Sequence, residues 1–416
     1  MTGPDIITLG CRLNTFESEI IRDACGQAGL GNAIIINTCT VTAEAERQAR
    51  QTIRRARRDN PGAKLIVTGC AAQMDPDRFS AMDEVDHVFG NAEKLDPDTY
   101  ANLVDGPAVS VSDIMAVRET APHLVSGFDG RTRAFVQVQQ GCDHRCTFCI
   151  IPYARGRHRS VGMGAVTEQI RTLIDGGFRE VVLTGVDISS YGADLPGAPR
   201  LGDLVRRLLD GVPGLERLRL SSIDPAAVDN SLIETLGDDP RLMPHMHLSL
   251  QSLEDTVLKR MKRRHSVTDV MHLADRLRRA RPDVVFGADL IAGFPTETDA
   301  MFETTLANVR DLGVPHLHVF PYSERPGTPA ARMPKVDKPV RKERAARLRA
   351  LGETTLSLCL QERTGSSVRI LVEKPGTGLS EHFLPATLHG PATPGQIVAA
   401  RVTGNDGGRL LATVGQ

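Results

Sequence analysis

Nine residues, about a third of the way along the chain, decide how the rest is interpreted: Gly141-Cys142-Asp143-His144-Arg145-Cys146-Thr147-Phe148-Cys149. Three thiolates within eight residues can reach one compact metal centre from a single loop. A cubane iron–sulfur cluster normally takes four protein thiolates. Three thiolates therefore leave one iron open to a small molecule.

An open iron of this kind suits S-adenosylmethionine, which chelates it through its amino and carboxylate groups. Electron transfer then cleaves the sulfonium and releases an adenosyl radical. The alternative is a zinc loop, but structural zinc sites take four ligands, commonly in C-x2-C pairs. His144 and His158 lie near the triplet, whereas a fourth cysteine does not. We predict a [4Fe-4S] cluster on Cys142, Cys146 and Cys149, which are also the expected catalytic residues.

Composition places this motif in an ordinary globular chain. The 416 residues indicate two to four domains, with 41% hydrophobic and 24% charged residues. The formal net charge is −1, so a nucleic-acid partner would be held by local basic patches. With 12 Phe, 4 Tyr and no Trp, a surface built on aromatic stacking of bases is disfavoured.

The chain shows neither a secretory leader nor an apolar run of the roughly 18 residues that a membrane span needs. We therefore expect a cytoplasmic protein without a membrane partner. In a reducing compartment, the eight cysteines indicate metal or redox chemistry rather than disulfides.

The motif follows the first strand of a series in which strands and helices alternate, over about residues 134–362. Six repeats predict a partial TIM-like (βα)6 barrel, with its chemistry on the loops after the strands. The predicted strands are Ala134–Gln139, Glu180–Thr184, Arg217–Leu220, His245–Leu250, Val284–Leu290 and His316–Phe320. The predicted helices are 165–175, 201–211, 228–237, 253–261, 266–280 and 298–312.

Three more cysteines follow strands in the region before the barrel, at about residues 4–110. Strands at 6–9, 33–37 and 64–68 alternate with helices at 15–29 and 43–58, which predicts a parallel α/β sheet. Ligands bind such sheets at the carboxyl ends of the strands. Cys11, Cys39 and Cys70 lie one to three residues past these ends, so they can converge on a second metal centre. Alternatively, each is a buried apolar thiol, which is what we predict for Cys25 and Cys359.

The last part of the chain, residues 364–416, reads as short strands separated by Gly and Pro turns. The expected strands are 367–372, 384–388, 397–402 and 409–414. They predict a small antiparallel β-barrel, an architecture often used on nucleic acid. Residues 111–133 form a less regular polar connection between the first two parts.

Polar groups and glycines at the ends of the barrel strands predict a cofactor site. The candidate contacts are Gly185, Asp187, Ser249, Gln251 and Gly293. Ordinary turn chemistry after a strand is the alternative. Arg155 and Arg157 are candidates for placing a carboxylate of substrate or cofactor. Basic runs at 54–58, 259–264 and 341–344 are either solvated helix faces or contacts to a phosphate backbone.

At these residues the chain resembles the methylthiotransferases of the radical S-adenosylmethionine superfamily. The motifs that carry the resemblance are Thr8-Leu9-Gly10-Cys11, Asn37-Thr38-Cys39, Thr68-Gly69-Cys70 and the central triplet. The resemblance implies an auxiliary [4Fe-4S] cluster on Cys11, Cys39 and Cys70, a radical barrel and a C-terminal TRAM domain that binds RNA. It also implies tRNA as partner, a sulfur source, and an electron donor such as flavodoxin or ferredoxin.

The flanking residues are similar to one branch of that family, which modifies threonylcarbamoyladenosine in tRNA. The stretches concerned are Thr8–Glu19, Asn37–Thr42 and Cys149–Gly156, although Arg12-Leu13-Asn14 replaces the branch's usual Lys-Val-Asn. The resemblance implies insertion of a methylthio group at C2 of the modified adenosine next to the anticodon. The alternatives are isopentenyladenosine in tRNA, an aspartate of a ribosomal protein, or a non-catalytic iron–sulfur protein that binds RNA or senses redox state.

Overall fold

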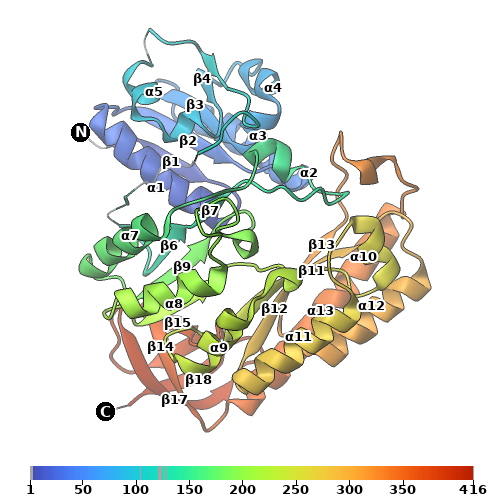
Figure 1. The fold of residues 1–416 in the computed structure, drawn as a ribbon. Helices are drawn as coiled ribbons and strands as arrows, with labels where there is room; N and C mark the ends of the chain where they lie inside the picture. The colour runs from blue at the N-terminus through green and yellow to red at the C-terminus, as the bar shows by residue number, and fades with distance from the viewer. Residues whose placement is uncertain (1–2, 104, 120–123, 126, 129, 416) are drawn as a thin grey trace.

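The computed structural model describes residues 3–103, 105–119, 124, 125, 127, 128 and 130–415, and its strands form three bodies (Figure 1). An N-terminal sheet lies above an open central barrel, and a small closed barrel lies below it. Part of the predicted connection 111–133, at residues 120–123, 126 and 129, lies outside the described residues. In the part of the chain that the structure describes, none of the helices has the length and apolarity that crossing a membrane would require.

The N-terminal sheet has five parallel strands in the order β1-β2-β3-β4-β5. Ile35 and Ile66 face α1 on one side, and Ile34 and Ile36 face α2 on the other. The sheet is therefore covered on both faces, as near-continuous apolar strands require. Its strands are Asp5–Thr8, Ala33–Thr38, Lys64–Gly69, His87–Phe89 and Val109–Ser110. Its helices are α1 (Arg12–Gln27), α2 (Ala43–Asp59), α3 (Cys70–Met74), α4 (Pro76–Ser80) and α5 (Pro97–Ala101).

The central body is an open barrel of six parallel strands. Continuous hydrogen-bonded ladders join β6-β9-β10 and β11-β12-β13, and single bridges at Leu218–Leu242 and Ile223–Leu248 connect the two halves. The six strands are Arg133–Gln137, Glu180–Thr184, Arg217–Leu220, His245–Gln251, Val285–Ala292 and His316–Pro321. The helices between them are α7 (Met163–Asp175), α8 (Leu201–Gly211), α9 (Asn230–Asp238), α10 (Asp255–Met261), α11 (Val267–Ala280) and α12 (Asp299–Leu312). The predicted partial barrel is confirmed.

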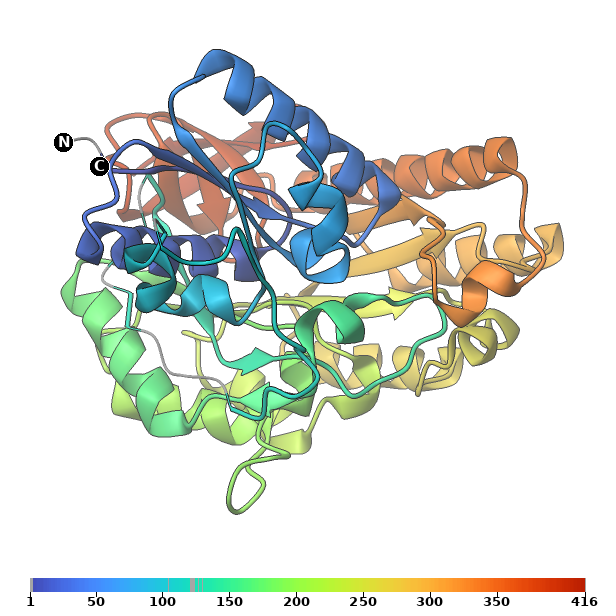
Figure 2. The same ribbon diagram turned by 90° about the horizontal axis from the view of Figure 1, so that it is seen from above.

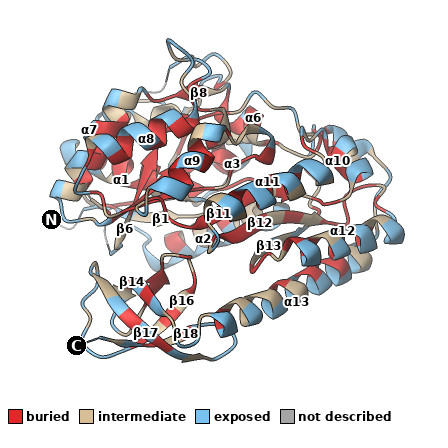
Figure 3. Cartoon of the chain, turned by 60° about the horizontal axis from the view of Figure 1, so that its bottom comes forward, coloured by how far each residue is buried: buried red, intermediate tan, exposed pale blue. Residues whose placement is uncertain are grey.

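Two features close the open barrel. Phe16 and Ile20 of α1 belong to the same buried apolar cluster as the barrel strands, so the N-terminal body covers one side. The 25-residue helix α13 (Lys338–Glu362), for which the sequence suggested a helix near Cys359 but no bounds, packs against β12, β13 and α12 (Figure 2). Figure 3 shows the buried strands between helices whose outer faces are exposed.

The C-terminal body is a closed barrel in the order β14-β15-β16-β18-β17. Its strands are Ser367–Lys374, Thr377–Ser380, Pro385–His389, Ile397–Asn405 and Leu410–Val414. Strand β15, which is short and contains Gly378, was not among the predicted strands. Four pairings are antiparallel, but β16 pairs with β18 in parallel, which corrects the expectation of a wholly antiparallel barrel. A ring with an odd number of strands cannot alternate direction at every pairing.

The closed barrel docks against the lower end of the central barrel, where the central strands begin. Arg217 donates to the carbonyl of Arg369 at 2.6 Å, and Arg219 donates to the carbonyl of Ser380 at 2.7 Å. Phe383, in the β15–β16 loop, stacks on His245 with ring centroids 4.9 Å apart. Its φ of 65° is a backbone conformation that bulky residues rarely adopt. Because Phe383 stacks on His245 at the start of β11, the β15–β16 loop covers the lower end of the central barrel, and we call it the floor of that barrel.

Candidate active site

The central cysteine loop lies at the upper end of the barrel. Cys142, Cys146 and Cys149 line one cavity of about 170 Å³, together with residues that follow β9 and β10 and residues at the end of β11. The loop begins at Gly141, with φ 68°, where an added Cβ would lie 1.8 Å from the carbonyl oxygen of Arg157. Only glycine allows the chain to pass so close at this point.

The donor set of this cavity fits a cluster with one open iron. All three thiols are free, and burial raises the pKa of Cys142 and Cys149 to about 12. A strongly cationic metal centre is therefore needed to hold them as thiolates. Arg263 lies 3.7 Å from Cys146 Sγ through Nη1, and it donates to the carbonyl of Ser249 at 2.6 Å. Its charge offsets that of bound thiolates.

The zinc alternative fits less well. Ligand atoms of Cys142, His144 and Asp187 lie within 4.8 Å of one another. However, His144 Nε2 is already 3.0 Å from Asp187 Oδ2, and Ser190 donates to the same oxygen at 2.7 Å. These two bonds lower the pKa of Asp187, although burial alone would raise it. A zinc ion here would also leave Cys146 and Cys149 without a role.

The second triplet lines a neighbouring cavity of about 460 Å³. Cys11, Cys39 and Cys70 each follow a parallel strand of the N-terminal sheet, as predicted, and the structure brings all three to one wall. Two glycines with positive φ allow this convergence. A Cβ on Gly10 would lie 2.7 Å from Cys39 Cβ, and a Cβ on Gly69 would lie 2.5 Å from the amide nitrogen of Thr38.

A buried ionic cluster supports the second triplet from behind. Arg155 Nε lies 3.0 Å from Cys70 Sγ, and both Nη1 and Nη2 donate to Glu17. Lys94 Nζ donates to Glu17 Oε2 at 2.7 Å. Burial alone would raise the pKa of Glu17, but Arg155 and Lys94 outweigh it and lower that pKa to about 2. Two cations against one anion leave one positive charge beside the thiols.

This cluster changes the interpretation of Arg155. Its guanidinium is saturated by Glu17 and Asn14, so it positions Cys70 rather than a carboxylate of substrate. Arg157 is exposed. Glu17 and Lys94 were missed because neither a carboxylate on a helix nor a lysine in a single 3-10 turn gives a signal of its own in the sequence.

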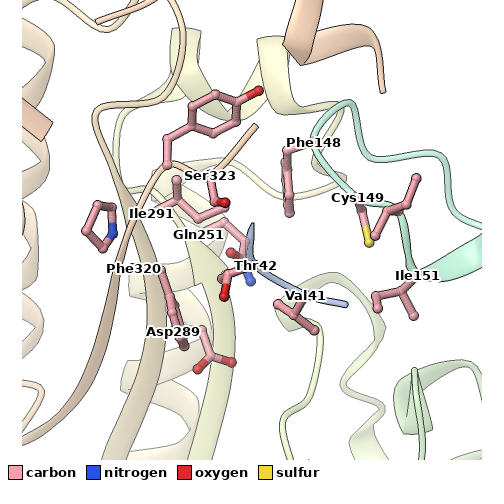
Figure 4. Close-up of a pocket in the computed structure, with 13 residues that line it drawn as sticks. Val41, Thr42, Phe148, Cys149, Ile151, Gln251, Asp289, Ile291, Phe320 and Ser323 are labelled. Atoms are coloured by element: carbon pink, nitrogen blue, oxygen red, sulfur yellow. The ribbon is translucent and has the colours of Figure 1, made fainter. Parts of the chain in front are cut away.

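The two cysteine cavities adjoin. Ile151, Val186, Ser222 and Ser249 line both of them. A third, mainly apolar cavity of about 280 Å³ continues from Cys149 and Gln251. In the view of Figure 4, Val41 and Thr42 of the N-terminal body lie between Phe320 of the barrel on one side and Ile151 on the other. Together the three cavities form one cleft between the two bodies.

Four of the five predicted cofactor contacts line this cleft. Asp187 and Gln251 are in the first cavity, Gly185 is in the second, and Ser249 is in both. Gly293 is placed elsewhere, where an added Cβ would lie 2.3 Å from Cγ of Arg341 on α13.

One group of cleft residues was not predicted. Asp289 Oδ1 lies 3.1 Å from His247 Nε2 and 3.3 Å from His318 Nδ1, and these contacts hold the pKa of Asp289 well below its usual range even though burial opposes them. The signal was present in the sequence. Histidines alternate with apolar residues at 245 and 247 and again at 316 and 318, so each pair faces one side of its strand.

The three basic runs divide between surface and interior. Arg54, Arg55 and Arg58 of α2 are exposed, as a solvated helix face predicts. Arg263 lies in the cleft, whereas Arg344 is buried and donates to Glu297 at 2.7 Å. Cys25 is buried in the core of the N-terminal body, and Cys359 packs on the C-terminal barrel, which confirms that both are packing residues.

A cysteine triplet with this spacing, at the upper end of an open (βα)6 barrel, defines a radical S-adenosylmethionine enzyme. A model of the radical SAM superfamily matches residues 136–309, and a model of an uncharacterized protein family, UPF0004, matches residues 5–90. The structure of the radical S-adenosylmethionine methyltransferase TsrM from Kitasatospora setae is similar in fold, with a TM-score of 0.57, 16% identity, and 79% of this chain and 75% of that chain covered.

Sequence identity to known proteins shows which family of radical S-adenosylmethionine enzymes this chain belongs to. The threonylcarbamoyladenosine tRNA methylthiotransferase MtaB of Rickettsia prowazekii is 51% identical, over 98% of this chain and 96% of its own. The Bacillus subtilis MtaB is 38% identical, over 83% and 79%. A tRNA-2-methylthio-N(6)-dimethylallyladenosine synthase of Cereibacter sphaeroides is 34% identical, over 96% and 95%. The chain belongs to the radical S-adenosylmethionine methylthiotransferase family, in the branch of the threonylcarbamoyladenosine tRNA methylthiotransferases.

Proposed function

We propose that this enzyme attaches a methylthio group to C2 of threonylcarbamoyladenosine, next to the anticodon of tRNA. The observation that carries the proposal is the pair of cysteine triplets in adjoining cavities with four shared wall residues. A radical generated in one cavity and a sulfur held in the other would meet at that wall. The names of the relatives with 51% and 38% identity support threonylcarbamoyladenosine as the target.

The proposal assigns Cys142, Cys146 and Cys149 to a [4Fe-4S] cluster with S-adenosylmethionine, and Cys11, Cys39 and Cys70 to a second [4Fe-4S] cluster. When bound, the first group supplies the radical that activates the substrate, and the second supplies the sulfur. An electron donor such as flavodoxin or ferredoxin and a sulfur source complete the partners.

The chain's own residues orient these groups and exclude water. Arg263 lies beside the first triplet and Arg155 beside the second, so each places a positive charge next to thiolates. Asp187, Gln251, Gly185 and Ser249 line the space left for S-adenosylmethionine. The apolar cavity beyond Cys149 offers a dry surface for a nucleobase, because it is lined by Phe148, Ile291 and Phe320 among others.

Iron and sulfide analysis tests the two-cluster assignment. Anaerobic reconstitution should give about eight iron and eight sulfide per chain, and replacing Cys11, Cys39 and Cys70 with Ala should leave about four. That triple variant should still cleave S-adenosylmethionine when reduced but should form no methylthio product. Loss of cleavage as well would contradict the division of labour.

Mass spectrometry of tRNA nucleosides from a deletion strain tests the substrate. We expect 2-methylthio-threonylcarbamoyladenosine to disappear and threonylcarbamoyladenosine to accumulate. The 34% identity to a dimethylallyladenosine synthase makes that nucleoside the second candidate substrate. Loss of its methylthio form alone would favour the second candidate.

A further inference from the structure

Arg12 is the first residue of helix α1 and directly follows Cys11. Its half-buried side chain lines the cavity of the second triplet. The guanidinium stands 5.9 Å from the centroid of Phe383, and its electrostatic neighbours are Arg133, Arg219, Asp289 and Cys11. Within the described residues, Arg12 forms neither an ion pair nor a hydrogen bond with its side chain.

The other cations near Arg12 or in its cavity are already paired. Arg133 lies 2.8 Å from Glu373, and Arg219 lies 2.7 Å from Glu180. Arg155 donates to Glu17 and Asn14. A guanidinium presents five N–H donors in a planar fork that matches a carboxylate. Arg12 therefore keeps this capacity for a ligand in the cleft.

The acidic side chain that lines this cavity, Asp289, is held by partners other than Arg12. Asp289 is placed between His247 and His318, and Ser222 donates to its other oxygen at 3.3 Å. In addition, α1 starts at Arg12, and its N-cap residue Cys11 makes no side-chain capping bond. The positive end of the helix dipole adds to the charge of the guanidinium.

The names of the relatives give two substrates, and these differ in the charge of the substituent on N6 of the adenine. A dimethylallyl group is neutral and apolar, whereas a threonylcarbamoyl group ends in a carboxylate. In adenine, C2 and C6 flank the same ring nitrogen, N1, so the N6 substituent leaves the base near the edge that carries C2. A base whose C2 faces the second triplet therefore brings the N6 substituent close to the residue after Cys11.

We propose that Arg12 binds the carboxylate of the threonyl group and thereby selects threonylcarbamoyladenosine over adenosines with a neutral N6 substituent. The proposal rests on the proposed function, because it takes its geometry from sulfur delivery at C2. It makes Arg12 a substrate-binding residue that no cysteine motif identifies.

The test uses anaerobically reconstituted enzyme and two anticodon stem-loop RNAs. One carries threonylcarbamoyladenosine, and the other carries the same nucleoside with its carboxylate replaced by a carboxamide. The dissociation constant is measured with S-adenosylmethionine but without reductant, and kcat/KM for methylthiolation is measured with reductant. The variants are Arg12→Gln, Arg12→Lys and, as a control on the same helix, Arg22→Gln, whose arginine pairs with Glu19 outside the cleft.

The wild-type enzyme should prefer the carboxylate RNA by about 10-fold or more in both measurements, as expected for a charged hydrogen-bonded pair. Arg12→Gln should reduce that preference to about twofold or less, Arg12→Lys should keep most of it, and Arg22→Gln should keep all of it. Iron content and the thermal midpoint show whether each variant is folded and loaded.

Three results would overturn the proposal while leaving the function intact. Arg12→Gln could weaken both RNAs equally, which is the behaviour of a phosphate contact. It could raise only the KM for S-adenosylmethionine, which is the behaviour of a cofactor-carboxylate contact. It could also leave the preference unchanged. Failure of the wild-type enzyme to modify the carboxylate RNA would instead refute the proposed function.

Discussion

Glu180, at the start of β9, holds two arginines where the C-terminal barrel docks. Arg219 Nε lies 2.7 Å from Oε1, and Arg217 Nη1 lies 3.2 Å from Oε2, with all three side chains buried. Burial alone would raise the pKa of Glu180, but Arg219 and Arg217 outweigh it and hold that pKa below its ordinary value. The carboxylate is therefore charged at neutral pH.

Glu180→Gln keeps the shape of this side chain but leaves two buried guanidinium groups without a counter-charge. Breaking a buried ion pair by neutralising one partner costs about 3–5 kcal/mol. The same arginines donate to the carbonyls of Arg369, Ser380 and Glu381, at 2.6, 2.7 and 2.8 Å. We therefore expect the loss to appear first as undocking of the C-terminal barrel.

Anaerobic urea unfolding, followed by circular dichroism, measures the loss, and hydrogen exchange of the β14 and β15 amides locates it. Glu216→Gln is the matched control. Glu216 also pairs with two arginines, Arg179 at 2.7 Å and Arg369 at 3.1 Å, but these pairs are partly exposed. The control should cost at most about 1 kcal/mol. A similar small cost for Glu180→Gln, or unchanged exchange in β14 and β15, would refute the reasoning.

Three further predictions concern the second triplet and acid stability. Arg155→Met removes the cation 3.0 Å from Cys70 Sγ, so reconstituted iron should fall from about eight toward about four per chain, whereas exposed Arg157→Met should not change it. Gly69→Ala puts a Cβ 2.5 Å from the Thr38 backbone at a residue whose φ is 95°. The substitution should lower the free energy of unfolding by about 2 kcal/mol or more and also halve the iron content per chain. The control Gly62→Ala, whose Cβ meets open space, should change neither quantity. Burial lowers the pKa of His316 to about 4, and the neighbouring His247 acts in the same direction. Below about pH 6.5, His316 therefore binds a proton in the unfolded chain but not in the folded chain. The free energy of unfolding should fall by up to about 3 kcal/mol as the pH drops from about 6.5 to 4. When the urea midpoint is plotted against pH over this range, it should fall less steeply in His316→Asn than in the exposed-site control His272→Gln. Equal slopes would contradict the assignment of the effect to His316.

The sequence predicted the six barrel strands to within about two residues because apolar runs alternate there with amphipathic helices. It also predicted that Cys11, Cys39 and Cys70 each follow a strand, which is enough to place all three at one sheet edge. The bounds of helix α13 escaped prediction because its buried residues, such as Ala345, Leu348 and Leu360, do not form one continuous apolar face.

What the sequence could not predict depends on partners that are far apart in the chain. Arg155 has the same local pattern as Arg157, yet one is buried against Glu17 and the other is exposed. Arg263 and Lys262 are neighbours in one basic run, but only Arg263 turns into the cleft. Such differences arise from tertiary pairing, which charge spacing along a helix does not contain.

The floor that Phe383 provides has a consequence for the order of events on the ribosome. Both cysteine triplets lie between residues 11 and 149, so they are translated well before Phe383. Chains generally fold from the N-terminus during synthesis. A nascent chain that does not yet include Phe383 thus presents both sets of thiols in a barrel that is still open from below, and the later synthesis of the β15–β16 loop allows that end to be covered. Insertion of iron and sulfide during translation would therefore meet a wider entrance than insertion into the completed enzyme.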